Sequence, residues 1–88
     1  MADVTIYTKA DCPYCTRAKE LLTAKSVHYK EIRAANDRAV REQMVRQSRG
    51  RNTFPQIFIN TLHIGGCDDL YALEKAGKLD NLLQENRK

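Results

Sequence analysis

The chain has 88 residues, of which 42% are hydrophobic and 30% charged, and its formal net charge is +4. This length suits a single domain over residues 1–88, and the hydrophobic content excludes a disordered chain. The longest apolar run, residues 70–73, is far shorter than the roughly 20 residues of a membrane-spanning helix. An acid at position 3 stands where a signal peptide would carry a base. We therefore expect a cytoplasmic protein with no membrane partner.

The positive charge is concentrated in residues 33–51, which hold six arginines against Asp37 and Glu42 and so account for the whole net charge. A basic surface can attract nucleic acid, but this stretch contains no aromatic residue on which a base could stack. We expect it to form a solvated helix face, with no nucleic-acid partner.

The first predicted element is a strand at residues 4–8, where β-branched and aromatic residues alternate. A helix is expected to begin at Pro13, because proline suits the first helical position, and its apolar residues recur at helical spacing as far as Leu22. A second strand is predicted at residues 27–32. The intervening segment is long enough for a crossover through the helix, so the two strands should be parallel.

A second helix is predicted from a cap at Asn36 or Asp37 to a point just before Gly50. Residues 57–59 form a continuous apolar run, which is typical of a central strand. A tight turn then leads into an antiparallel partner at residues 62–64.

The last part of the chain predicts two further helices. Residues 65–66 are glycines that end the preceding strand, and Asp68 or Asp69 can cap a third helix that ends at Gly77. Leucines in residues 79–83 indicate a short final helix. The predicted order is βαβαββαα, an α/β fold with one four-stranded mixed sheet flanked by helices.

Two of the three cysteines, Cys12 and Cys15, lie at the predicted start of the first helix with Pro13 and Tyr14 between them. At this spacing their Cα atoms are roughly 5 to 5.5 Å apart, which a disulfide accepts. Cys12 is predicted to be the nucleophile, because the amides of Tyr14 and Cys15 and the helix dipole favour its thiolate. Cys15 lies on the apolar face, where burial disfavours a thiolate, and it fits the role of resolving thiol.

The cysteine pair has two other interpretations. The pair could be half of a zinc site completed by His63 and Cys67, or two inert core residues, but it follows a strand, opens a helix and lacks a second Cys-x-x-Cys. We therefore expect redox chemistry and no metal. Cys67 by itself is either a buried apolar residue or an oxidisable thiol. His28 and His63 are isolated strand residues and are predicted to be structural.

Three motifs in this order resemble the dithiol glutaredoxins: Cys-Pro-Tyr-Cys at 12–15, Thr-Phe-Pro at 53–55 and Gly-Gly-Cys-Asp-Asp at 65–69. The short length is similar to that of the glutaredoxin 3 type. The resemblance implies a monomer with a thioredoxin fold that reduces protein disulfides and glutathione mixed disulfides, with glutathione as reductant. Ribonucleotide reductase and glutathionylated proteins are among the family's usual substrates.

The resemblance also implies a glutathione site and a cis bond before Pro55, which would present the Phe54 backbone to an extended peptide. The family usually has valine where this chain has Phe54. The amides that begin the third helix suit the γ-glutamyl carboxylate, an aspartate there suits its ammonium, and Lys9 suits the glycine carboxylate. The implied glutathione-binding residues are Lys9, Tyr14, Thr53, Phe54, Pro55, Gly66, Cys67, Asp68 and Asp69.

Two competing functions remain open at this point. A thioredoxin-like donor recharged by a flavoenzyme reductase would need no glutathione pocket, so the Gly-Gly-Cys-Asp-Asp segment argues against it. A carrier in which Cys12 of two chains and two glutathiones hold an iron–sulfur cluster is opposed by Pro13, because in this family a proline after the first cysteine disfavours the cluster.

Overall fold

The computed structural model describes residues 2–34 and 36–84. Its four strands form one sheet in the order β2-β1-β3-β4. Strand β1 runs parallel to β2 and antiparallel to β3, which in turn pairs antiparallel with β4. The predicted four-stranded mixed sheet is therefore confirmed. The strand bounds are Val4–Thr8 for β1, Tyr29–Arg33 for β2, Gln56–Ile59 for β3 and Leu62–Gly65 for β4.

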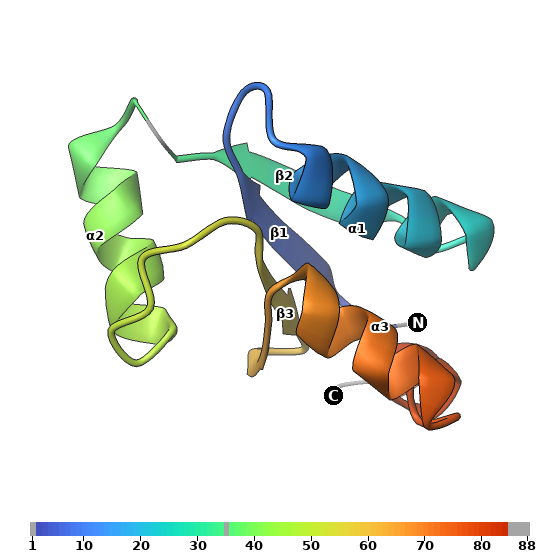
Figure 1. Ribbon diagram of the computed structural model, residues 1–88. Helices are drawn as coiled ribbons and strands as arrows, with labels where there is room; N and C mark the ends of the chain where they lie inside the picture. The colour runs from blue at the N-terminus through green and yellow to red at the C-terminus, as the bar shows by residue number, and fades with distance from the viewer. Residues whose placement is uncertain (1, 35, 85–88) are drawn as a thin grey trace.

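Within the described residues, four helices accompany the sheet: α1 at Pro13–Ala24, α2 at Arg38–Gln47, α3 at Cys67–Lys75 and α4 at Leu79–Gln84. Helices α1 and α3 lie side by side over one face, and α2 lies apart from them at the other side of the sheet (Figure 1). This element order and sheet topology are those of the thioredoxin fold that the resemblance implied. Among the described residues, no helix is long and apolar enough to cross a membrane.

Alternation along the strands produces a hydrophobic core on each face of the sheet. On one face Ile6 of β1 packs with Leu22 of α1 and Leu70 of α3, and all three are fully buried. On the other face Tyr7, the next residue of β1, packs against Met44 of α2 and several neighbours. One short strand thus anchors helices on both sides of the sheet, including the helix that begins beside the cysteine pair.

Strand β2 begins two residues later than predicted. The amide of Val27 donates a 3.1 Å hydrogen bond to the carbonyl of Leu22, so it closes the end of α1 instead of joining the sheet. Of the two predicted caps of α2, the structure uses Asp37, whose side chain accepts a 3.2 Å hydrogen bond from the Val40 amide.

The predicted cap of α3 is wrong. Its N-cap is Gly66, and Asp68 and Asp69 lie in the first turn instead, where negative side chains favour the helix dipole. The helix begins earlier than predicted because the N-cap position needs no side chain when another group satisfies the free amide. Here the Asp69 carboxylate does so, accepting a 2.9 Å hydrogen bond from the Gly66 amide. Gly77, with φ of +74°, follows the end of α3 as predicted.

Candidate active site

The candidate active site is built around Cys12, which ends the loop between β1 and α1 and is the N-cap of that helix. Its Sγ accepts a 3.2 Å hydrogen bond from the amide of Cys15. Pro13 occupies the first turn, where its missing amide hydrogen costs nothing. Of the two amides predicted to stabilise the Cys12 sulfur, the structure records the one from Cys15. The sulfur thus lies at the positive end of the helix dipole.

The two cysteines of this dithiol differ in their surroundings although both are buried and neither is in a disulfide. Burial is the largest of the causes that raise the pKa of Cys15 to about 12, and the hydrogen bond with the Cys12 side chain acts in the same direction. The Cys15 side chain is therefore a neutral thiol at neutral pH. The Cys12 sulfur accepts the Cys15 amide at the N-terminus of α1, so the geometry favours charge on the first cysteine of the pair.

A pocket of about 330 Å³ opens beside the dithiol, within the size range of small-molecule sites. It contains every residue that the resemblance assigned to glutathione except Lys9, and adds one residue that sequence reasoning missed, Arg51. The lining residues are Tyr14, Arg51, Thr53, Phe54, Pro55, Gly66, Cys67, Asp68 and Asp69. Segments that are far apart in the chain, namely the start of α1, the loop before β3 and the start of α3, are therefore brought to one place.

Phe54 lines this pocket, and two cationic side chains lie near its ring. The Nζ atom of Lys9 lies 6.0 Å from the ring centroid, and the Cζ atom of Arg41 lies 5.8 Å from it. Lys9 is thus placed near the pocket wall although it does not line the pocket. The peptide bond between Phe54 and Pro55 is cis, as the resemblance implied.

Two of the residues that line the pocket form an ion pair. Arg51 Nη1 lies 3.3 Å from Asp69 Oδ2, and the same carboxylate oxygen accepts the Gly66 amide. The hydrogen bond from Gly66 and the Arg51 guanidinium lower the pKa of Asp69, so this carboxylate keeps its charge in mildly acidic solution. Opposite charges side by side suit a ligand group that is itself zwitterionic. Sequence reasoning placed Arg51 in the basic stretch, because the chain alone does not show that it reaches Asp69.

Gly65 is required for this arrangement. Its φ is +117°, and a Cβ atom at this position would lie 2.3 Å from Asp69 Oδ2 and 2.9 Å from Arg51 Nη1. A larger residue would therefore collide with the ion pair while also adopting a backbone conformation that only glycine adopts easily.

A partly buried chain of hydrogen bonds reaches the lining of the pocket at Thr53. His63 Nε2 lies 2.7 Å from Gln56 Oε1, and Gln56 Nε2 donates to both the carbonyl and the Oγ1 of Thr53 at 3.0 Å. Because Gln56 Oε1 can only accept, His63 Nε2 carries the hydrogen. His63 was predicted to be structural. In the structure it contacts Gln56, which in turn donates to the pocket residue Thr53. Sequence reasoning missed Gln56.

Cys67 is buried, as the first of its two interpretations expected, and it also lines the pocket. Burial raises the pKa of its thiol. Among residues 2–34 and 36–84, no three side chains of His, Cys, Asp or Glu are grouped so that they could hold a metal ion. The zinc arrangement considered for Cys12, Cys15, His63 and Cys67 is thus not formed in that part of the chain.

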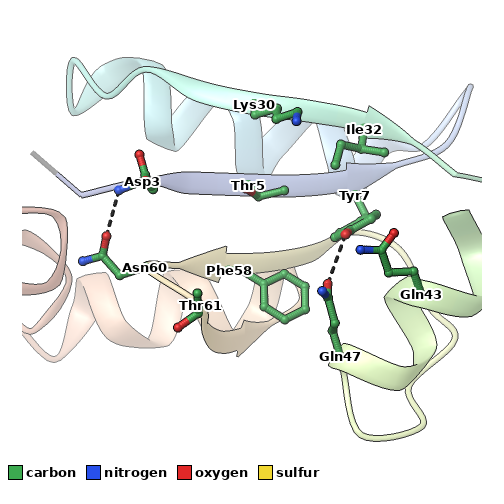
Figure 2. Close-up of a pocket in the computed structure, with 10 residues that line it drawn as sticks. All are labelled: Asp3, Thr5, Tyr7, Lys30, Ile32, Gln43, Gln47, Phe58, Asn60 and Thr61. Atoms are coloured by element: carbon green, nitrogen blue, oxygen red, sulfur yellow. Dashed lines mark hydrogen bonds between the residues drawn. The ribbon is translucent and has the colours of Figure 1, made fainter. Parts of the chain in front are cut away.

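A larger pocket, of about 620 Å³, lies on the sheet face that α2 partly covers (Figure 2). Tyr7 donates a 3.1 Å hydrogen bond to Gln47 there, and the Asp3 amide donates a 2.9 Å bond to Asn60. The residues that line it include no cysteine and none of the predicted site residues. The smaller pocket is therefore the one that contains the predicted site residues.

Comparison with known proteins finds that the family model described as Glutaredoxin matches residues 4–64. The chain is 57% identical over 84 residues to glutaredoxin 3 of Escherichia coli K12, covering 96% of this chain and 100% of that one. It is similar to the solution structure of glutaredoxin from Brucella melitensis, with a TM-score of 0.85, 56% identity and coverage of 100% and 95%. It is also similar to the buckwheat glutaredoxin–glutathione complex, with a TM-score of 0.84, 29% identity and coverage of 93% and 76%.

Proposed function

We propose a reaction path for this chain, which belongs to the glutaredoxin family, from the geometry of its dithiol and pocket. The protein is a glutathione-dependent thiol–disulfide oxidoreductase, with glutathione as co-substrate. The observation that carries the path is the hydrogen bond from the Cys15 amide to the Cys12 sulfur, beside a pocket that Tyr14 and Cys67 line.

In the dithiol route Cys12 is the nucleophile. Its thiolate attacks one sulfur of a substrate disulfide, a bond forms between Cys12 and that sulfur, and the other substrate sulfur leaves as a thiolate that takes up a proton. Cys15 then loses its proton and attacks Cys12 Sγ, which releases the second substrate sulfur and leaves a Cys12–Cys15 disulfide. The helix N-terminus favours charge on Cys12, so this sulfur is also a good leaving group whenever it is displaced.

Glutathione closes the cycle. One glutathione thiolate attacks the Cys12–Cys15 disulfide at Cys12, which returns Cys15 to the thiol and leaves glutathione joined to Cys12. A second glutathione attacks the sulfur of the bound one, so glutathione disulfide leaves and the Cys12 thiolate is restored. With a glutathionylated substrate, Cys12 attacks the glutathione sulfur, the substrate leaves as a thiolate, and glutathione is joined to Cys12 at once. The last step above then completes this monothiol route, which needs Cys12 alone.

The pocket beside the dithiol is the proposed glutathione site. The backbone of Phe54 would pair with the extended tripeptide, as in strand addition. The amides at the start of α3 and the carboxylates of Asp68 and Asp69 would hold the γ-glutamyl carboxylate and ammonium, while Lys9 would face the glycine carboxylate. This assignment is supported by the ion pair of Asp69 with Arg51, which puts both charges at one end of the pocket.

The partners and setting are proposed more broadly. Glutathionylated proteins and disulfide-containing proteins, ribonucleotide reductase among them, are the proposed protein substrates. We place the protein in the cytoplasm, as a monomer whose residues 1–88 form one domain. The support is that three cysteines, two of them in one Cys-x-x-Cys motif, are not the even, dispersed set of a secreted disulfide scaffold, and that the described elements pack on one sheet.

The test is reduction of a glutathione mixed disulfide in the presence of glutathione, glutathione reductase and NADPH. The intact protein should turn over, and the Cys12→Ser variant should not. Activity that survives Cys12→Ser would refute the assignment of the nucleophile. Activity that needs a flavoenzyme reductase and ignores glutathione would replace the path by that of a thioredoxin-like donor.

A further inference from the structure

A second groove lies on α2, next to the glutathione pocket. Its volume is about 450 Å³, and we call it the α2 groove; it is lined by Arg38, Arg41, Glu42, Val45, Arg46 and Asn52. Its lining thus includes three guanidinium groups, one carboxylate and the apolar side chain of Val45. In Figure 1 the loop that follows α2 returns along the helix before it enters β3.

The α2 groove and the glutathione pocket share a wall. Arg41 lines the groove, donates a 2.9 Å hydrogen bond from Nε to Asn52 Oδ1, and lies over the ring of Phe54. Phe54 in turn lines the pocket, as does Thr53, the neighbour of Asn52. A polypeptide whose disulfide reached Cys12 over Phe54 would therefore extend onto the groove.

The cations of the groove are open to new partners. Arg38 pairs with Glu42 at 3.3 Å, but its side chain is 93% exposed, and an exposed pair of this kind contributes little stability that a competing carboxylate would have to replace. Arg46 is exposed and has no ion pair within the described residues. Guanidinium groups bind carboxylates through paired hydrogen bonds, so an acidic chain fits these residues better than a neutral one.

We propose that the α2 groove binds an acidic segment of the protein substrate, with aspartate or glutamate residues adjacent to the cysteine that reacts with Cys12. The inference rests on the proposed function and adds its partner chemistry. Attraction between opposite charges raises the rate of encounter and orients the substrate before contact. Nucleic acid is the less suitable polyanion, because none of the residues lining the groove is aromatic and base stacking has no platform.

The test compares two glutathionylated peptides that differ only in whether the reactive cysteine is flanked by glutamates or by glutamines. The groove variant is Arg38→Gln with Arg46→Gln, which spares Arg41 because that residue borders the pocket. The matched control is Lys75→Gln with Lys78→Gln. Both lysines are exposed; Lys75 is the last residue of α3 and Lys78 lies between α3 and α4. The control therefore removes the same charge from another surface.

The groove variant should lose about fivefold in kcat/KM for the glutamate peptide, as expected for two exposed charge pairs, and should be unchanged for the glutamine peptide. The control variant should match the intact protein on both, and the loss should shrink at about 0.5 M salt. Equal losses in the groove and control variants, or no preference for the glutamate peptide in the intact protein, would overturn the proposal.

Two further outcomes separate this proposal from the proposed function. If the intact protein turned over neither peptide, the oxidoreductase path would fail, and binding of the reduced glutamate peptide to the Cys12→Ser variant would still decide on the groove. If a short single-stranded RNA displaced that peptide from the groove at a lower concentration than a polyglutamate of equal charge, the groove would belong to nucleic acid and the proposal would be wrong.

Discussion

The amide of Cys15 donates a hydrogen bond to the sulfur of Cys12, so the residue assigned to resolve the mixed disulfide also holds the sulfur on which that disulfide forms. The bond exists because Cys12 is the N-cap of α1 and Cys15 is one turn into the helix. One local geometry therefore stabilises charge on the first sulfur and buries the second. The two thiols are divided into different roles before any substrate arrives.

Alkylation should distinguish the two thiols. At pH 7 iodoacetamide is expected to modify Cys12 well before Cys15, because thiolates react and a pKa of about 12 leaves roughly one Cys15 side chain in 100,000 ionised. Mass spectrometry of digests after short exposure measures the order. Cys12→Ser should protect the protein from rapid modification, whereas faster labelling of Cys15 than of Cys12 would contradict the division of roles.

The resolving step should accelerate with pH. Cys15 must lose its proton to attack, and burial, the larger cause of its raised pKa, persists when Cys12 is joined to glutathione. The thiolate fraction therefore rises about tenfold per pH unit while the pH stays below the pKa. Closure of the Cys12–Cys15 disulfide from the mixed disulfide, followed by acid quench, should show this slope from about pH 6 to about pH 9. A rate that levels off near neutral pH would show that Cys15 ionises far more easily than its burial implies.

Replacing the resolving thiol should separate the two routes. Cys15→Ser is expected to retain activity on glutathione mixed disulfides, which need only Cys12, and to lose activity on protein disulfides, which need the second thiol. Coupled assays with glutathione reductase measure both. The serine is close in size to cysteine and leaves the backbone amide in place, so the hydrogen bond to Cys12 is kept. Equal loss on both substrates would refute the assignment.

Gly65 should tolerate no side chain. Gly65→Ala is expected to destabilise the protein by about 1–3 kcal/mol through its positive φ. It should also raise the KM for glutathione about tenfold, as for one lost hydrogen bond to a charged group, because the new methyl displaces Asp69. Gly77→Ala is the matched control: φ is +74° there, but no atom lies within 4 Å of the added Cβ. It should lower stability alone, and a similar rise in KM in both variants would remove Asp69 from the explanation.

The hydrogen bonds that link His63 through Gln56 to Thr53 should matter for glutathione binding. Gln56→Leu removes the donors to Thr53 and the acceptor for His63, so stability should fall by about 1–3 kcal/mol and the KM for glutathione should rise. His63→Leu keeps the bonds from Gln56 to Thr53 and should have the smaller effect on KM. Urea unfolding and steady-state kinetics measure the two quantities. If Gln56→Leu lowered stability without changing KM, Gln56 would support the fold alone.

The local features of this protein follow from its sequence. Alternation in residues 4–8 predicts β1, and Pro13 predicts the start of α1, so Cys12 is placed at a helix N-terminus by interactions among near neighbours. The dithiol, its predicted order of reaction and the order of elements need little more than propensities and spacing. The pocket residues came from resemblance to a family, since spacing alone does not bring residues 14, 53 and 67 together.

The remaining features depend on contacts between distant residues. Arg51 and Asp69 are 18 positions apart, and their ion pair exists only because the antiparallel pairing of β3 with β4 brings the loop before β3 next to the start of α3. Gly66 is the N-cap of α3 because Asp69 satisfies its amide, which propensity cannot distinguish from a cap at Asp68. Hydrophobic periodicity reports which face a residue lies on and not which residue it meets there. The tertiary structure alone therefore decided the contacts among distant residues in the pocket beside the reactive sulfur.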